Sequence, residues 1–154
     1  MGTLLESVNE HLHWIRVKIG IDLQRNSLER HAYPCKKEIW WVSLGKNVGV
    51  EANGKNYSFE RPVVVLHVFK NASMLVVPLT TTISENEHIF SFTSSKGTSS
   101  LANISQIRTL STKRFIRNIG YIQDEDFIRL VDLIKLLILK SETPLSGVSS
   151  EPSK

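Results

Sequence analysis

Residues 38–80 read EIWWVSLGKNVGVEANGKNYSFERPVVVLHVFKNASMLVVPLT, and this stretch decides the fold. Three runs within it are rich in aromatic and β-branched residues, a composition typical of β-strands. They cover residues 38–44, 61–69 and 74–79. A polar, glycine-bearing loop joins the first run to the second, and a tight turn joins the second to the third. The stretch therefore predicts three consecutive strands, with the long apolar second run in a central position.

Shorter segments follow beyond residue 80. Residues 88–93 alternate as a half-exposed strand does, and residues 101–110 show a further strand pattern after a serine- and glycine-bearing turn. We expect a short helix over residues 112–117 and another extended piece beginning at Gly120. From Asp124 onward, acidic residues suit a helix N-terminus and apolar residues recur at helical spacing. This pattern predicts a C-terminal helix.

The first third of the chain has a different periodicity. Apolar residues at helical spacing between Thr3 and His31 predict an amphipathic helix, or two helices if Gly20 introduces a break. Thr3 and Glu6 fit a capping box at its start. The helical pattern ends at Tyr33, because the residue before a proline avoids the helical region.

These patterns divide the chain into three parts. We expect residues 1–35 to form an N-terminal amphipathic helical extension, residues 36–140 one domain, and residues 141–154 a serine- and proline-rich disordered tail. The domain is expected to be mainly β with α additions. Strands at this spacing predict a small curled sheet or partial barrel.

Composition narrows the classes of function. The net charge of +4 is a modest basic excess, which favours approach to polyanions. The single cysteine, Cys35, excludes a disulfide framework, and the five histidines show no metal-ligand spacing. We find neither a signal peptide nor the roughly 20 apolar residues of a membrane span. We therefore expect a cytoplasmic protein that uses no metal or cofactor and does not contact a membrane.

Several segments, in order along the chain, resemble the MazF/PemK family of type II toxin–antitoxin endoribonuclease toxins. An opening strand leads into a Gly-x-Glu loop, an Arg-Pro-Val strand, a strand ending on threonine, and a Gln-Ile-Arg-Thr block. The segments are 38–44, 48–51, 61–66, 77–80, 105–110 and 113–120. The resemblance rests on their order and spacing and covers roughly residues 36–140, so the N-terminal extension lies outside it.

The resemblance implies a small SH3-like barrel of the MazF/PemK/CcdB type that forms a homodimer, here with a C-terminal helix and an extra N-terminal helix. The implied activity is that of an mRNA interferase, a toxin that inhibits growth. Such an enzyme cleaves single-stranded RNA at short sequences without a metal. The implied partners are RNA and a cognate antitoxin whose disordered tail covers the RNA groove.

The same resemblance assigns roles to five residues. Arg61 and Thr80 match the catalytic positions, and Glu51, Thr81 and Gln106 are expected to contact RNA. Attack by an RNA 2′-hydroxyl needs a base, an acid and positive charge beside the phosphorane, and these can act without a metal. A guanidinium suits the charge-stabilising role because its N–H groups pair with phosphate oxygens.

Alternatives stay open for some of these side chains. Arg61 could be a strand-edge cation paired with Glu60 or Glu38, and Gln106 could brace the sheet instead of touching RNA. Glu51 could position RNA or act as the general base. Trp40 and Trp41 could stack on RNA bases, but neighbours on a strand face opposite ways, so at most one lines a given surface.

Two departures from the family pattern keep other functions open. Ser105 stands where some family members carry an acid, which leaves the general base unassigned. The loop over residues 52–60 is longer than the family's usual glycine turn, and this difference would change the preferred RNA sequence. One alternative is a non-catalytic barrel that binds a protein such as gyrase, although such a protein has no need of the Arg61/Thr80 pair. Another is a degenerate member that binds RNA without cleaving it.

Overall fold

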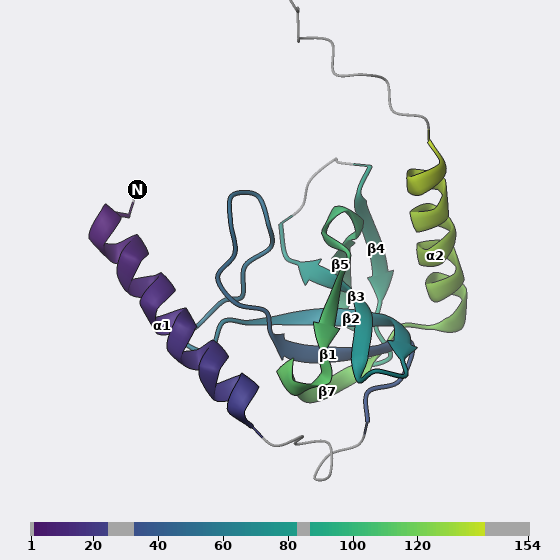
Figure 1. Cartoon of the computed structure of the whole chain (residues 1–154). Coiled ribbons are helices and arrows are strands. Elements are labelled where there is room, and N and C mark those ends of the chain that lie inside the picture. The colour runs from purple at the N-terminus through teal and green to yellow at the C-terminus, as the bar shows by residue number, and fades with distance from the viewer. Residues whose placement is uncertain (1, 25–32, 83–86, 141–154) are drawn as a thin grey trace, which may run out of the picture.

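The computed structural model describes residues 2–24, 33–82 and 87–140 (Figure 1). The helices are α1 (Leu4–Leu23) and α2 (Asp124–Leu139), with 3-10 helices η2 (Ile104–Gln106) and η3 (Thr112–Arg114). The strands are β1 (Glu38–Ser43), β2 (Glu60–Phe69), β3 (Ser73–Thr80), β4 (Ile89–Thr93), β5 (Ser99–Asn103), β6 (Arg108–Ser111) and β7 (Phe115–Tyr121). The tail expected over residues 141–154 lies outside the described residues. Neither α1 nor α2 has the length and apolar content needed to cross a bilayer.

The strands form one antiparallel sheet in the order β4-β5-β3-β2-β1-β7, and β6 also pairs with β3. Residues 38–80 supply the three predicted strands as β1, β2 and β3, and these pair in sequence order, with β2 between the other two. Figure 1 shows β4 and β5 crossing the layer of β1, β2 and β7, so the sheet curls over on itself. The predicted mainly β fold, with one helix before the sheet and one after it, is confirmed.

Apolar side chains are buried on both faces of the central strand β2. Val63, Val64 and Val65 are fully buried, and they divide between two core clusters because neighbours on a strand point to opposite faces. Helix α2 covers the cluster that contains Val64, and it does so with Phe127 and Leu130. Burial on both faces explains why β2 reads as an uninterrupted apolar run.

The prediction of a single strand over residues 101–110 is wrong, because η2 interrupts this segment. The Asn103 side chain accepts a hydrogen bond from the Ser105 amide at 3.2 Å and turns the chain into this 3-10 helix. The two halves then pair with different ends of β3: β5 with its last residues, Leu79 and Thr80, and β6 with its first four. A turn between them is needed because one straight strand cannot pair with β3 at both positions.

The helix predicted over residues 112–117 is shorter than expected. Ser111 caps it by accepting a hydrogen bond from the Lys113 amide, but it ends at Arg114. Phe115 is buried and pairs with Val42 of β1, so this pairing draws the following residues into β7. Gly120 lies near the end of that strand and does not begin a new one.

Helix α1 is one continuous helix, and the capping box of Thr3 and Glu6 is present. Gly20 lies within it, so the alternative of two helices is wrong for the part up to Leu23. The expected continuation toward His31 falls on residues 25–32, outside the described residues. The helix is anchored to the barrel by Trp14, a buried side chain that packs on Phe59 with ring centroids 5.3 Å apart.

Candidate active site

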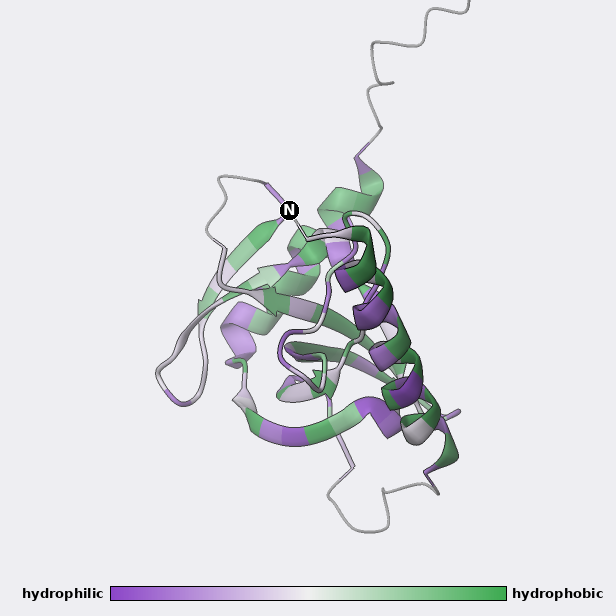
Figure 2. Ribbon diagram, turned by 90° about the vertical axis from the view of Figure 1, so that its left-hand side faces the viewer, coloured by the Kyte–Doolittle hydropathy of each residue, from purple (hydrophilic) through white to green (hydrophobic). Residues whose placement is uncertain are grey.

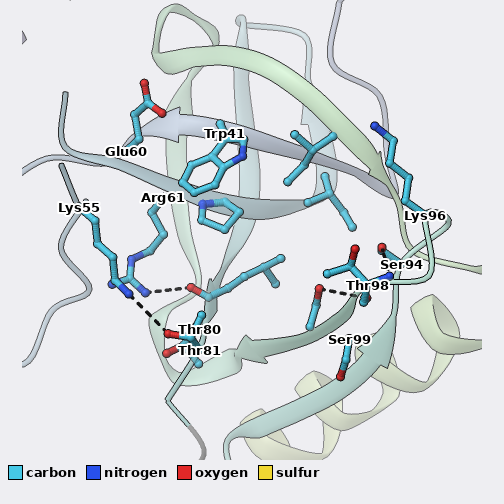
Figure 3. A pocket seen from close by; sticks show the side chains of 15 residues that line it. Trp41, Lys55, Glu60, Arg61, Thr80, Thr81, Ser94, Lys96, Thr98 and Ser99 are labelled. Carbon is cyan, nitrogen blue, oxygen red and sulfur yellow. Dashed lines mark hydrogen bonds between the residues drawn. The ribbon is translucent and has the colours of Figure 1, made fainter. Parts of the chain in front are cut away.

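Arg61 and Thr80 come together because they lie on neighbouring strands. Val63 of β2 pairs with Pro78 of β3. Two positions further along this antiparallel ladder, Arg61 lies opposite Thr80. Both side chains line one pocket of about 430 Å³, together with Thr81 (Figure 3). Three of the five predicted site residues therefore share one surface.

The Arg61 guanidinium is fixed by backbone oxygens. Its Nε donates to the Asn53 carbonyl at 2.6 Å, and its Nη1 donates to the Leu79 carbonyl at 2.8 Å. Among the described residues, these bonds leave three of its five N–H donors without a partner. Arg61 does not form the alternative ion pair with Glu60, because Glu60 pairs with Arg117 at 3.0 Å. Partial burial lowers the pKa of Arg61, because desolvation disfavours the charged form.

The two threonines lie at the end of β3. The Thr80 hydroxyl oxygen accepts a hydrogen bond from the Thr82 amide at 3.1 Å, which leaves its hydrogen available as a donor. The Thr81 hydroxyl lies 3.5 Å from the Lys55 ammonium. Thr80 therefore presents a fixed hydroxyl beside a fixed guanidinium, an arrangement that suits a phosphate group with oxygens on two sides.

Gln106 and Glu51 occupy different positions. The Gln106 side-chain oxygen accepts from the Ala52 amide at 2.8 Å, and its nitrogen donates to the Val50 carbonyl at 3.3 Å. Gln106 also lines a smaller pocket of about 260 Å³ that includes Arg61 and Thr80. Glu51 is exposed and accepts a hydrogen bond from the Val48 amide, so it closes a turn within its own loop. The structure does not bring Glu51 into either pocket.

The loop that carries Asn53 depends on a glycine. A Cβ on Gly54 would lie 1.8 Å from the Phe59 carbonyl oxygen, closer than any side chain can approach. The Gly54 amide in turn donates to the Gly45 carbonyl at 2.7 Å. This close approach sets the path of the loop and so places the carbonyl that holds Arg61.

The charged groups around the larger pocket are mainly cationic. Lys55 and Arg61 lie on one side and Lys96 on the other, with Trp41 between them (Figure 3). Glu60 is the one carboxylate among the described residues that line it, and Figure 3 shows that carboxylate directed away from Arg61. Across the described ranges, no group of three or more His, Cys, Asp and Glu side chains is arranged to hold a metal ion.

The sequence profile of one protein family, described as the PemK-like, MazF-like toxin of type II toxin–antitoxin systems, matches residues 36–138. The chain belongs to this family. The match includes every strand and nearly all of α2, and α1 lies outside it. A search of curated protein sequences gave no significant match.

Solved structures of MazF proteins share the fold. MazF from Deinococcus radiodurans superposes with a TM-score of 0.59 at 16% identity, over 70% of this chain and 98% of that one. An endoribonuclease in complex with its cognate antitoxin, from a mycobacterial species, gives 0.55 at 16% identity, over 71% and 99%. At this identity the likeness shows the fold, and the predicted small barrel of the MazF type is confirmed.

Two lysines at the pocket of this MazF-like protein were missed by the sequence reasoning. Lys55 lies in the β1–β2 loop and Lys96 in a turn, and no pattern marks either as a site residue. Of the two tryptophans considered for stacking on RNA, Trp41 lines the pocket, since Trp40 is buried in the core and its neighbour faces the other way. Arg117 stacks on the Trp41 ring at 5.1 Å and holds it at the pocket wall.

Replacing Gln106 tests whether it braces the loop. Gln106→Ala removes both hydrogen bonds to residues 50–52, and we expect a loss of about 1–2 kcal/mol in the free energy of unfolding. Amide hydrogen exchange should accelerate at Ala52, measured by mass spectrometry or NMR. Ser105→Ala serves as the matched control because its exposed side chain bonds to Asn103 and not to the described residues of the β1–β2 loop. Unchanged stability and exchange in Gln106→Ala would contradict the bracing role and favour direct RNA contact.

Proposed function

We propose that this member of the MazF/PemK family is a toxin that cleaves single-stranded RNA without a metal ion. The observation that supports this most directly is the pairing of Arg61 and Thr80 at one pocket, where three guanidinium donors beside a hydroxyl have no partner in the described part of the chain. A barrel that only binds a protein has no need of such a pair. Sequence selectivity and growth inhibition are part of the proposal and come from the family resemblance.

The proposed chemistry is an internal transfer at phosphorus. The RNA 2′-oxygen attacks the phosphorus atom, the bond from phosphorus to the 5′-oxygen breaks, and a 2′,3′-cyclic phosphate and a 5′-hydroxyl result. The proton of the 2′-hydroxyl passes to a base, and the departing 5′-oxygen takes up a proton. Arg61 stabilises the added negative charge on the phosphorane. Its lowered pKa also makes it a better proton donor to the 5′-oxygen than a solvated arginine.

The remaining pocket residues suit single-stranded RNA. Lys55 and Lys96 provide positive charge on both sides of the pocket, which attracts the phosphate backbone. Trp41 is half-buried and lines the space between them, so its ring is placed to stack on an unpaired base. Thr81 lies at the edge nearest Lys55 and can contact a phosphate or ribose oxygen.

Ser105 is not positioned as a substitute base. Its hydroxyl donates to the Asn103 side chain at 2.7 Å within the cap of η2. No histidine is found among the described residues that line the pocket, and the Glu60 carboxylate is directed away from Arg61. We therefore propose that catalysis depends mainly on Arg61 and Thr80. The group that accepts the proton of the 2′-hydroxyl would take its place only in the complex with RNA.

We further propose an antitoxin partner, a homodimeric assembly and a cytoplasmic location. Support for the antitoxin comes from solved relatives, among them the mycobacterial endoribonuclease bound to its antitoxin and a MazE–MazF complex from Deinococcus radiodurans. An antitoxin segment that occupies the Arg61 pocket would need acidic side chains to pair with Lys55 and Lys96.

The test is cleavage of RNA in the presence of EDTA. Purified protein incubated with a long single-stranded RNA and excess EDTA is expected to give discrete fragments, with cyclic phosphate at the 3′ ends and hydroxyl at the 5′ ends. Mass spectrometry of the fragments identifies both termini. Intact RNA would contradict the proposal, and gel-shift binding without cleavage would favour the non-cleaving RNA binder.

A further inference from the structure

Helix α1 contacts the barrel through one side. Trp14 is buried against Phe59, and His13 Nε2 lies 2.8 Å from the Tyr57 carbonyl oxygen. Lys46 forms an ion pair with Glu10 on the same side. These contacts hold α1 in place with the β1–β2 loop, so the helix does not need a partner in order to be positioned.

The larger apolar stripe of α1 faces away from Trp14. It contains Leu4, Val8, Leu12, Ile15, Ile19 and Leu23, whose exposed fractions range from 44% to 83%. At 3.6 residues per turn these six side chains fall on one face of the helix, and Leu5 lies at its edge. Figure 2, which views the molecule from the α1 side, shows hydrophobic segments along the length of the helix. An apolar face of this extent usually marks an interaction site.

The apolar residues of this stripe have the same spacing when counted from either end of the helix. Successive members are separated by 4, 4, 3, 4 and 4 residues, so the pattern is symmetric about the middle of the helix. A second α1 placed antiparallel brings Leu4 opposite Leu23, Val8 opposite Ile19, and Leu12 opposite Ile15. A two-fold symmetric contact requires such a self-complementary surface. We propose that α1 pairs with α1 of a second copy of this chain in an antiparallel orientation.

Charge favours the antiparallel orientation over the parallel one. Glu6 and Glu10 lie on the side of α1 that faces the barrel, where Glu10 pairs with Lys46, whereas Arg16, Lys18 and Asp22 of the second half flank the stripe. Ile15 and Ile19 of the stripe line a groove of about 380 Å³ that is also lined by Lys113 and Arg114 of η3. Parallel pairing would place Arg16 and Lys18 beside their own copies, whereas antiparallel pairing places them beside His11 and Asn9 of the other helix.

The expected strength of this contact follows from its size. A helix of 20 residues is about 30 Å long, so the paired faces form an interface at the small end of the specific range. Because α1 is already docked on its own barrel, pairing does not have to fold the helix first. We expect dissociation in the micromolar range, or an additional association step if the barrels dimerise by another surface.

The test compares assembly masses of full-length variants by sedimentation equilibrium over a range of micromolar concentrations. Val8→Glu and Ile19→Lys each place a charge in the apolar face, and each is expected to raise the dissociation constant at least tenfold. Both positions are about half exposed, so the fold should survive, as circular dichroism would verify. Ser7→Glu adds the same charge at a neighbouring exposed position of α1 outside the stripe and should leave the mass unchanged.

The double variant Val8→Glu/Ile19→Lys decides the orientation. In the antiparallel pair each glutamate faces a lysine of the other copy, so association should return toward the wild-type level. In a parallel pair the like charges would meet, and association would stay weak. Unchanged masses in both single variants, or no recovery in the double variant, would overturn the proposal. A dimer formed by the barrels alone would give the first of these outcomes.

Discussion

Arg61→Ala is expected to reduce the rate of RNA cleavage by roughly 10²–10³-fold or more, the effect of removing one preorganised donor to a developing negative charge. The loss is large because the guanidinium is held by the Asn53 and Leu79 carbonyls, so it needs no reorganisation when the phosphorane forms. The measurement is single-turnover cleavage of a labelled RNA in EDTA.

Thermal unfolding and two further variants separate an effect on chemistry from an effect on folding. Arg61→Ala also leaves two carbonyls without their donor, at about 1–3 kcal/mol, so thermal unfolding must show that the variant is folded at the assay temperature. Arg61→Lys keeps the charge but loses the fork of donors, and it should restore only part of the rate. Arg129→Ala, an exposed arginine on α2 paired with Asp126, should cleave normally. Full activity in a folded Arg61→Ala protein would contradict the proposed role.

Leu130→Ala is expected to lower the free energy of unfolding by about 2–5 kcal/mol, since it leaves a cavity in a packed core. Leu130 has no exposed surface and packs between α2 and the sheet with Phe127, Val64 and Ile39. A loss of this size is a large share of the free energy of unfolding of one domain. The measurement is urea unfolding followed by tryptophan fluorescence.

Leu136→Ala is the matched control on the same helix. It removes the same atoms from a side chain that is 55% exposed, and we expect a change within about 0.5 kcal/mol. A similar loss in both variants would mean that α2 is stabilised along its whole length, for instance by a contact with another molecule. A small loss for Leu130→Ala would contradict the core described above.

The strands could be predicted because their patterns were strong. Residues 38–80 carry β-branched runs that leave few other structures open, and β1, β2 and β3 lie close to the predicted positions. The errors came where pairing, not local pattern, decides the structure. The turn at η2 exists because β5 and β6 pair with different parts of β3, and its local signal is limited to the cap residue Asn103.

The site was predictable only in part. The order of segments pointed to Arg61 and Thr80, and the ladder of β2 and β3 places them side by side. The contacts of Gln106 with the loop could not be predicted from the sequence. They join Gln106 to Ala52 and Val50, which precede it by 54 and 56 positions in the chain. Glu51 was expected at the RNA surface, yet within the described structure it contacts its own loop.

The bonds that Arg61 and Gln106 make to the β1–β2 loop involve backbone atoms of the loop. Arg61 binds the Asn53 carbonyl, and Gln106 binds the Ala52 amide and the Val50 carbonyl. Two side chains at the rim, Val48 and Val50, remain 77% and 93% exposed. Because a backbone group is the same in every residue, the rim side chains can be exchanged without disturbing the guanidinium. Such a design separates the part of the molecule that can diversify its targets from the part that must stay constant.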